Sequence, residues 1–141
     1  MLRASIPALC LLLAACGANA AREELPAPQL PQRAGVDPLV AARAEGVEFR
    51  AVGEGFVLDI FRTERIRLTL TATGEELVFP KTEPRYPRWS GSIYDTSNGT
   101  RRLHIEIRNY RNCESADSAA YPDTVRVRLD QRELQGCGRA F

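Results

Sequence analysis

The sequence predicts a small all-β domain: an antiparallel barrel or sandwich of six to eight strands with one disulfide, preceded by a flexible tether and a short helix. Three observations favour this fold class. Apolar and polar residues alternate in several short segments, turn-forming residues separate these segments, and two cysteines lie in the same part of the chain. Alternation with a period of two places apolar side chains on one face of a strand, and closely spaced strands of this kind are typical of sandwiches and barrels.

Residues 1–15 predict a lipoprotein signal peptide. Arg3 precedes an apolar run that is shorter than the roughly 20 residues needed to cross a bilayer, so the run does not predict a membrane helix. Leu13-Ala14-Ala15-Cys16 resembles the bacterial lipobox, which implies cleavage before Cys16 and lipidation of its thiol. An ordinary secretory signal cut a few residues later is the alternative. Because Gly17 follows the cysteine, we expect an anchor in the outer membrane, on its periplasmic face.

Residues 16–36 predict the tether, because they contain three prolines and almost no large apolar side chains. Asp37 then offers a helix N-cap with Pro38 at the first helical position, and Gly46 ends the favourable stretch. A short helix of about two turns is expected between them. Residues 37–141 are predicted to form one β domain, since the chain is too short for two cores.

Strands are expected wherever the period of two is clear. The four cleanest segments begin at Val47, Ile66, Leu103 and Val125. Phe56–Phe61 and Glu76–Phe79 are further candidates, with apolar residues on both faces. Turn residues separate the strands at Gly53 and Gly55, Thr73-Gly74, Asn98-Gly99 and Asp130-Gln131. The longest interruption, Pro80–Trp89, contains three prolines and predicts a rigid loop.

Cys113 and Cys137 are predicted to form the disulfide. Of the four cysteines, the other two lie in the export region. An even pair in an oxidising compartment is most simply a bridge, which would stabilise the fold by roughly 3–4 kcal/mol. A metal site is the alternative, but His104 is the chain's one imidazole and no close cysteine pair exists to chelate with it. We therefore expect no metal and no cofactor.

The charge balance argues against nucleic acid as a partner. The 19 Lys and Arg residues include Arg3, so removal of the signal leaves as many basic residues as the 18 Asp and Glu. The strand arginines form either a basic stripe for an anionic ligand or a solvated, salt-bridged face, and the second interpretation is preferred. These residues are Arg62, Arg65, Arg67, Arg102, Arg108, Arg126 and Arg128.

The C-terminal third carries a motif that resembles a known family. Tyr121-Pro122, Val125-x-Val127 and Leu134-x-Gly136-Cys137-Gly138 are similar to the end of a family of small, uncharacterised bacterial lipoproteins, in which an upstream cysteine, here Cys113, precedes the Tyr-Pro pair. Phe49-Arg50-Ala51-x-Gly53-Glu54 resembles that family's opening strand. The resemblance implies the fold and the location, but no activity.

A second motif resembles the membrane-bound inhibitors of c-type lysozyme. Ser90-Gly91-Ser92-Ile93-Tyr94 is similar to the Ser-Gly-x-x-Tyr sequence of those lipid-anchored, disulfide-bonded, eight-stranded barrels. In the family, a loop serine and a basic residue from a nearby loop enter the lysozyme cleft and contact its two carboxylates. The resemblance implies such a role for Ser90, Ser92 and Tyr94, with Arg101 or Arg102 supplying the cation.

Arg85-Tyr86-Pro87-Arg88-Trp89 is a second candidate binding segment. Aromatic residues and arginine dominate the binding energy of interfaces, so Tyr86, Arg88 and Trp89 are candidate contact residues. The alternative is a loop that folds Tyr86 and Trp89 over one end of the barrel. Both interpretations stay open at this point.

No catalytic set is recognisable in the sequence. His104 lies on the polar face of a predicted strand, where a solvated histidine is the better interpretation. The sequence therefore predicts a non-enzymatic envelope lipoprotein that is held to the membrane by the lipid on Cys16. Its expected role is binding or structural, with an envelope protein, a glycan or lysozyme as partner. Inhibition of c-type lysozyme is the alternative function.

Overall fold

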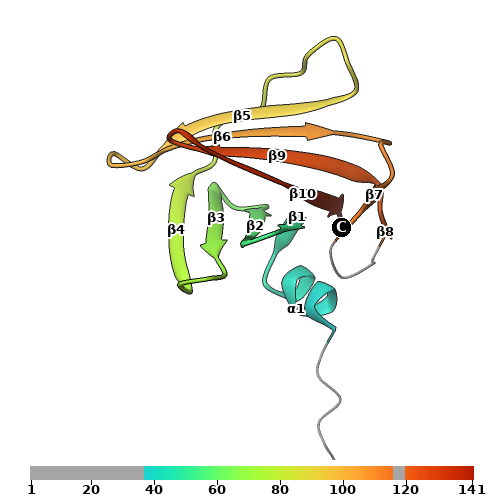
Figure 1. Ribbon diagram of the computed structural model, residues 1–141, viewed down its shortest axis with the longest axis horizontal. Helices are drawn as coiled ribbons and strands as arrows, with labels where there is room; N and C mark the ends of the chain where they lie inside the picture. The colour runs from blue at the N-terminus through green and yellow to red at the C-terminus, as the bar shows by residue number, and fades with distance from the viewer. Residues whose placement is uncertain (1–36, 116–119) are drawn as a thin grey trace, which may run out of the picture. The chain divides into compact units, whose positions relative to one another are not determined.

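The computed structural model describes residues 37–115 and 120–141; the predicted signal peptide, Cys16 and the tether lie outside them. The elements are α1 (Pro38–Ala44), β1 (Val47–Gly53), β2 (Phe56–Phe61), β3 (Arg65–Leu70), β4 (Glu75–Pro80), β5 (Gly91–Ser97), β6 (Arg102–Arg108), β7 (Cys113–Glu114), β8 (Ala120–Tyr121), β9 (Asp123–Leu129) and β10 (Arg132–Ala140). Eight strands form one antiparallel sheet in the order β4-β3-β2-β1-β10-β9-β6-β5, while β7 and β8 pair separately (Figure 1). The predicted all-β fold with one short helix is confirmed.

The sheet is nearly closed into a barrel by contacts between its two edge strands. The Thr96 hydroxyl on β5 donates to the Pro80 carbonyl at the end of β4 at 2.6 Å, and the Thr82 hydroxyl donates to the Asp95 carbonyl at 2.9 Å. These side-chain hydrogen bonds replace a regular backbone ladder at this seam. The Pro80–Trp89 segment then follows the edge of β5, because Arg85 and Ile93 exchange two backbone hydrogen bonds.

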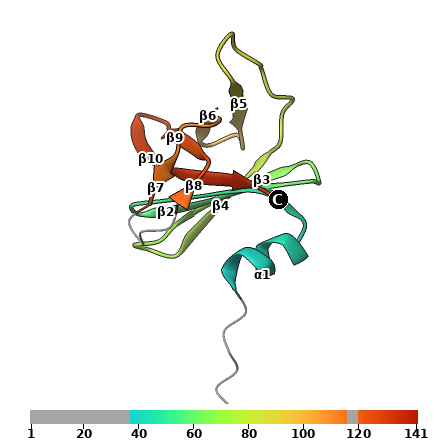
Figure 2. The same cartoon turned by 90° about the vertical axis from the view of Figure 1, so that its right-hand side faces the viewer.

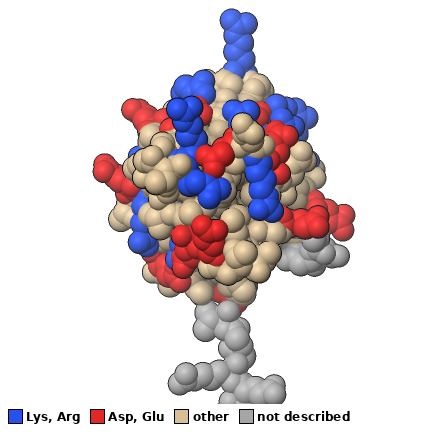
Figure 3. All heavy atoms as spheres, turned by 60° about the vertical axis from the view of Figure 1, so that its left-hand side comes forward, with Lys and Arg blue, Asp and Glu red and all other residues tan. Residues whose placement is uncertain are grey.

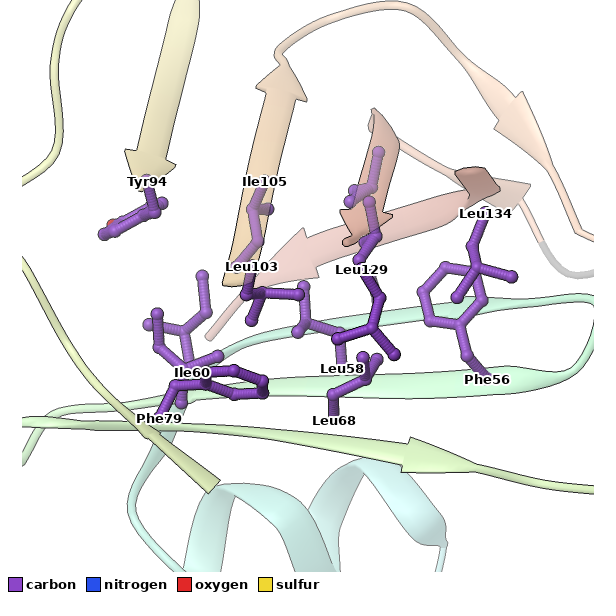
Figure 4. Close-up of a cluster of buried hydrophobic side chains, with 14 of the residues drawn as sticks. Phe56, Leu58, Ile60, Leu68, Phe79, Tyr94, Leu103, Ile105, Leu129 and Leu134 are labelled. Atoms are coloured by element: carbon purple, nitrogen blue, oxygen red, sulfur yellow. The ribbon is translucent and has the colours of Figure 1, made fainter. Parts of the chain in front are cut away.

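The core lies between the inward faces of the two halves of the sheet. β2 contributes Phe56, Leu58 and Ile60, all fully buried, and β6 contributes Leu103 and Ile105 from the other side. Figure 4 shows these side chains meeting with others from β3, β4, β5, β9 and β10. In these strands the apolar positions of the predicted alternation therefore face the core, and the polar positions face the outer surface.

The helix packs on the outside of the barrel over its N-terminal strands (Figure 2). Asp37 caps it as predicted, since its carboxylate accepts a hydrogen bond from the Leu39 N–H at 2.9 Å. Ala42 packs with Val47 and Phe61 in a second buried cluster. Phe61 points away from the barrel interior, so β2 is covered on both faces, as the sequence indicated.

Asp59 lies beneath the helix and neutralises two arginines. Its side chain is 2% exposed, and its neighbours across the sheet are Arg50 on β1 and Arg67 on β3. Arg50 donates to both carboxylate oxygens, at 2.6 and 2.9 Å, and Arg67 donates at 2.7 Å. The same arginines hold the helix: Arg50 donates to the Pro38 carbonyl and Arg67 to the Glu45 carboxylate. One buried carboxylate therefore fixes the helix to the barrel.

We expect Asp59→Asn to lower the free energy of unfolding by about 3 kcal/mol, because the partly buried Arg50 would lose its counter-charge and Arg67 would keep only the exposed carboxylates of Glu45 and Glu76. Urea denaturation at neutral pH measures this change. Asp130→Asn is the matched control: Asp130 pairs with Arg101 on an exposed turn, so little change is expected there. Equal stabilities of the Asp59 variant and the unmodified protein would contradict the role given to this carboxylate.

Candidate functional site

Two hollows lie side by side on the protein surface and share Arg108. The first, the aromatic pocket, has a volume of about 210 Å³ and is lined by Trp89, Ser90, Arg108, Asn109, Tyr110 and Arg111. The second, the disulfide groove, has a volume of about 370 Å³. It is lined by the turn between β1 and β2, the outer faces of β6, β9 and β10, and β7. We take these hollows together as the candidate site.

A glycine allows Trp89 to lie against the sheet. Gly91 has a φ of +152°, and a Cβ atom there would lie 2.0 Å from the Ile107 carbonyl oxygen and 2.4 Å from the Trp89 ring. A side chain at this position would therefore displace the indole. With glycine present, the ring packs beside Arg108, whose guanidinium carbon is 4.8 Å from the ring centroid. This is the geometry of a cation–π contact.

Glu106 orients the arginine. Arg108 donates to one oxygen of the Glu106 carboxylate from Nε at 3.0 Å and from Nη2 at 2.7 Å. Arg126, across the sheet on β9, lies 4.0 Å from the other oxygen. Glu106 is 14% exposed, whereas Arg126 is 51% exposed. Arg108 is thus held between a carboxylate and an aromatic ring, while Arg126 keeps hydrogen-bond donors free for a ligand.

The segment after β6 adopts an unusual backbone conformation. Tyr110 and Asn112 have φ values of +59° and +44°, a region that non-glycine residues rarely occupy. The Tyr110 N–H donates to the Asp123 carboxylate at 3.3 Å, and the Arg111 N–H donates to the Pro122 carbonyl at 2.9 Å. Burial raises the pKa of Asp123, and the hydrogen bond from Tyr110 opposes that rise. Strain of this kind clusters at functional sites, and here it leaves the Tyr110 side chain 81% exposed.

The disulfide closes the same segment. Cys113 bonds to Cys137, whose side chain points out of the barrel from β10 and is 3% exposed. This confirms the predicted bridge. It ties β7 to the outer face of β10, so the strained turn is held at both ends. In the chain-entropy account, a disulfide that closes a loop of this size stabilises the fold by about 3 kcal/mol.

Around the aromatic pocket, some guanidinium groups are unpaired. Among the described residues, Arg88 and Arg111 make no ion pair, whereas Arg85 pairs with Asp95 at 2.5 Å. Of the seven arginines of the predicted stripe, Arg67, Arg108 and Arg126 form ion pairs, and Figure 3 shows basic and acidic side chains interspersed on one face. The salt-bridged interpretation therefore fits part of that stripe, and Arg88 and Arg111 are the unpaired cations next to Trp89 and in its pocket.

The Ser90–Tyr94 motif does not form a loop as a whole. Ser90 is exposed and lines the aromatic pocket, but Gly91 begins β5. Tyr94 points into the barrel and is 8% exposed, and Ser92, on the same face of the strand, is hydrogen-bonded to its hydroxyl. Alternation along β5 therefore turns Tyr94 and Ser92 to the opposite face from the aromatic pocket, and of the motif only Ser90 lines that pocket.

Arg101 and Arg102 lie far from that serine. In the β5–β6 hairpin, Ser97 is opposite Arg102 and Gly91 is opposite Arg108. Six residue steps separate these pairs, which corresponds to about 20 Å. Arg101 is paired with Asp130 near the turn. The expected combination of Ser90 with Arg101 or Arg102 is therefore wrong, and Arg108 and Arg111 take the predicted place of the cation.

The Tyr86, Arg88 and Trp89 cluster is divided by the structure. Trp89 lines the aromatic pocket, whereas Tyr86 is 77% exposed. The loop runs beside β5, to which Arg85 bonds through its backbone, so it does not fold Tyr86 over the barrel end. Because of their positions, Trp89 and Arg88 remain candidate contact residues. Tyr86 contributes exposed aromatic surface on the same loop.

His104 takes part in a small polar cluster on the outer face of the β5–β6 hairpin. Its Nδ1 lies 2.6 Å from the Asp95 carboxylate. The hydrogen bond with His104, helped by Arg85, lowers the pKa of Asp95. No hydroxyl or thiol of the described residues is hydrogen-bonded to this imidazole, which is how a base would activate a nucleophile. The cluster therefore stabilises the outer surface of β5 and β6.

Comparison with known proteins gives no relative. No family model matches this chain, and no match was found among curated proteins or solved structures. The two resemblances seen in the sequence therefore stay predictions. Within residues 37–115 and 120–141, no cluster of histidine, cysteine, aspartate and glutamate side chains is placed to hold a metal ion. The same residues contain no helix with the length and apolarity needed to span a membrane.

Sequence reasoning missed Asn109, Tyr110 and Arg111 as site residues, and it placed Arg108 in the stripe. The signal that would have found them is the symmetry of the hairpin. Residues equally distant from a hairpin turn lie across from one another, and because this turn is centred between Gly99 and Thr100, one residue beyond the Asn98-Gly99 signal, Ser90 lies at the level of Asn109. The sequence motif alone gave no indication of this pairing.

Proposed function

We propose that this protein is a non-enzymatic, lipid-anchored envelope protein that binds a partner through its aromatic pocket. The observation that carries the proposal is the exposed Tyr110, held in a strained conformation beside the stacked Trp89 and Arg108. Tyrosine, tryptophan and arginine are the residues enriched at binding hot spots. In this proposal Cys16 carries the lipid, and the domain faces the periplasm from the outer membrane.

The pocket's size and charge support a large partner with acidic groups. A volume of about 210 Å³ is below the usual range for a small-molecule site, so it suits one group of a protein or glycan. Arg88 and Arg111 make no ion pair within the described part of the chain, so each can form charge-assisted hydrogen bonds to a carboxylate or phosphate. Tyr110, which lines the pocket, adds exposed aromatic surface.

A photo-crosslinking amino acid placed at position 110 tests this proposal in living bacteria that produce the full chain. We expect a covalent adduct from position 110, and a strong reduction of that adduct when Arg108→Gln is added. Val78 provides the control position, because it is also exposed but lies on β4, away from the pocket. Absence of an adduct at position 110, or the same adducts from both positions, would contradict the proposal.

Inhibition of c-type lysozyme is the second candidate function, and one observation favours it. Ser90 is exposed in a pocket that it shares with Arg108 and Arg111, so a hydroxyl and two guanidinium groups face one hollow. Those groups suit the two carboxylates of a lysozyme cleft.

A lysis assay with hen lysozyme and the purified protein tests this candidate. We expect inhibition that is lost in Ser90→Ala and in Arg108→Gln but retained in Arg102→Gln, which changes an arginine at the opposite end of the hairpin. Lack of inhibition at micromolar protein would exclude the lysozyme role and leave the first proposal in place. Inhibition that is equally strong in the Ser90 variant would exclude this site as its cause.

A further inference from the structure

The disulfide groove is a hollow of ligand size. Its volume of about 370 Å³ falls in the range typical of small-molecule pockets. The floor is the outer face of β9 and β10, with Thr124, Gln135 and the disulfide, and the walls are β7 and the β1–β2 turn. Because Arg108 separates the groove from the aromatic pocket, the groove can be occupied without contact to Tyr110.

Both signs of charge line this groove. Glu54 lies in the β1–β2 turn and Glu114 on β7, and neither makes an ion pair with any residue of the described ranges. Arg126 projects from β9 with half of its side chain exposed, and its one charged neighbour, Glu106, already accepts two hydrogen bonds from Arg108. The groove therefore offers both free acceptors and free donors.

The sheet register sets the spacing between these charges. Arg126 on β9 is opposite Gln135 on β10, and the next residue, Gly136, is opposite Gly53, which leads into Glu54. Two strand spacings correspond to about 10 Å between the backbones. Because both side chains are long, their charged ends can lie farther apart than the backbones. A gap of about 13 Å holds an extended dipeptide, whose charged termini lie about 7 Å apart, with a hydrogen bond of about 3 Å at each end.

The charges also exclude other classes of ligand. Glu106 and Arg108 neutralise each other, so a purely anionic ligand would be repelled by Glu54 and Glu114, and a purely cationic ligand by Arg126. An apolar ligand would remove these charges from water without replacing their hydrogen bonds, which is unfavourable. A ligand that carries an ammonium and a carboxylate satisfies both ends of the groove.

We propose that the disulfide groove binds a short zwitterionic peptide. Glu54 and Glu114 accept hydrogen bonds from the terminal ammonium, and Arg126 donates to the terminal carboxylate in the bidentate geometry that guanidinium favours. This proposal goes beyond the proposed function, because it requires neither the lipid anchor nor the aromatic pocket. Peptides of this chemistry come from two sources: degraded proteins, which supply L-residues, and cell-wall stems, which supply D-residues.

Isothermal titration calorimetry of the purified protein with dialanine tests the proposal. We expect the free dipeptide to bind with a dissociation constant near or below about 1 mM, as ligand efficiency predicts for so small a molecule. N-acetyl-dialanine and dialanine amide, which each lack one charge, should bind at least about tenfold more weakly. The L,L and D,D forms are compared, and a preference for either supports the proposal and identifies the source.

Variants locate the binding in the groove. Arg126→Gln and Glu54→Gln should each weaken dialanine binding at least about tenfold, since each removes one charged partner. Arg102→Gln and Glu133→Gln are the matched controls, because both residues are exposed on strands that border the groove, β6 and β10, but line no part of it themselves, and they should leave affinity unchanged. Circular dichroism checks that every variant is folded. Unchanged affinity in the groove variants, equal binding of the blocked peptides, or no binding of dialanine at about 10 mM would overturn the proposal.

Discussion

The pairing of β10 with both β1 and β9 joins the two halves of the sheet, and the surface around Arg108 depends on it. Close approach along this strand requires glycine. A Cβ atom on Gly136 would lie 2.3 Å from the Val52 carbonyl oxygen, and one on Gly138 would lie 2.5 Å from the Phe49 ring. Between these glycines, Cys137 points outward. The sequence that allows the barrel to close is therefore the same sequence that places a disulfide partner on its outer face.

The disulfide on β10 positions the residues of both hollows. The disulfide fixes Cys113, which ends the strained turn that presents Tyr110 and Arg111. The same bridge holds β7 as a wall of the disulfide groove. Asp123 begins β9 and accepts the Tyr110 N–H, so a buried carboxylate supports the other side of the turn. Both hollows thus depend on contacts made outside the barrel core.

The sequence was informative where one physical rule dominates a segment. Alternation predicted β3, β6 and β9 well, and Asp37-Pro38 predicted the start of α1. It was uninformative for β5, whose inward face carries Ser92 and Thr96 beside Tyr94, so the strand lacks an apolar period. For the site, composition identified Trp89 and Arg88. The prediction that Arg101 lies beside Ser90 failed. Arg101 is near the turn of the β5–β6 hairpin, whereas Ser90 is at the open end of that hairpin, far away in space. Tyr110 could not be identified as a site residue from the sequence, because its exposed position depends on a strained backbone conformation that no residue pattern encodes.

The central claim is that β10, through its disulfide, holds the turn that lies beside the indole in the binding surface. Nuclear magnetic resonance of the oxidised and reduced protein tests it most directly, because Trp89 is the chain's single tryptophan and gives one indole N–H signal. The account predicts that reduction shifts this signal and broadens the amides of Tyr110 and Arg111, while the amides of β2 and β3 stay in place. An unchanged indole signal after complete reduction would contradict it.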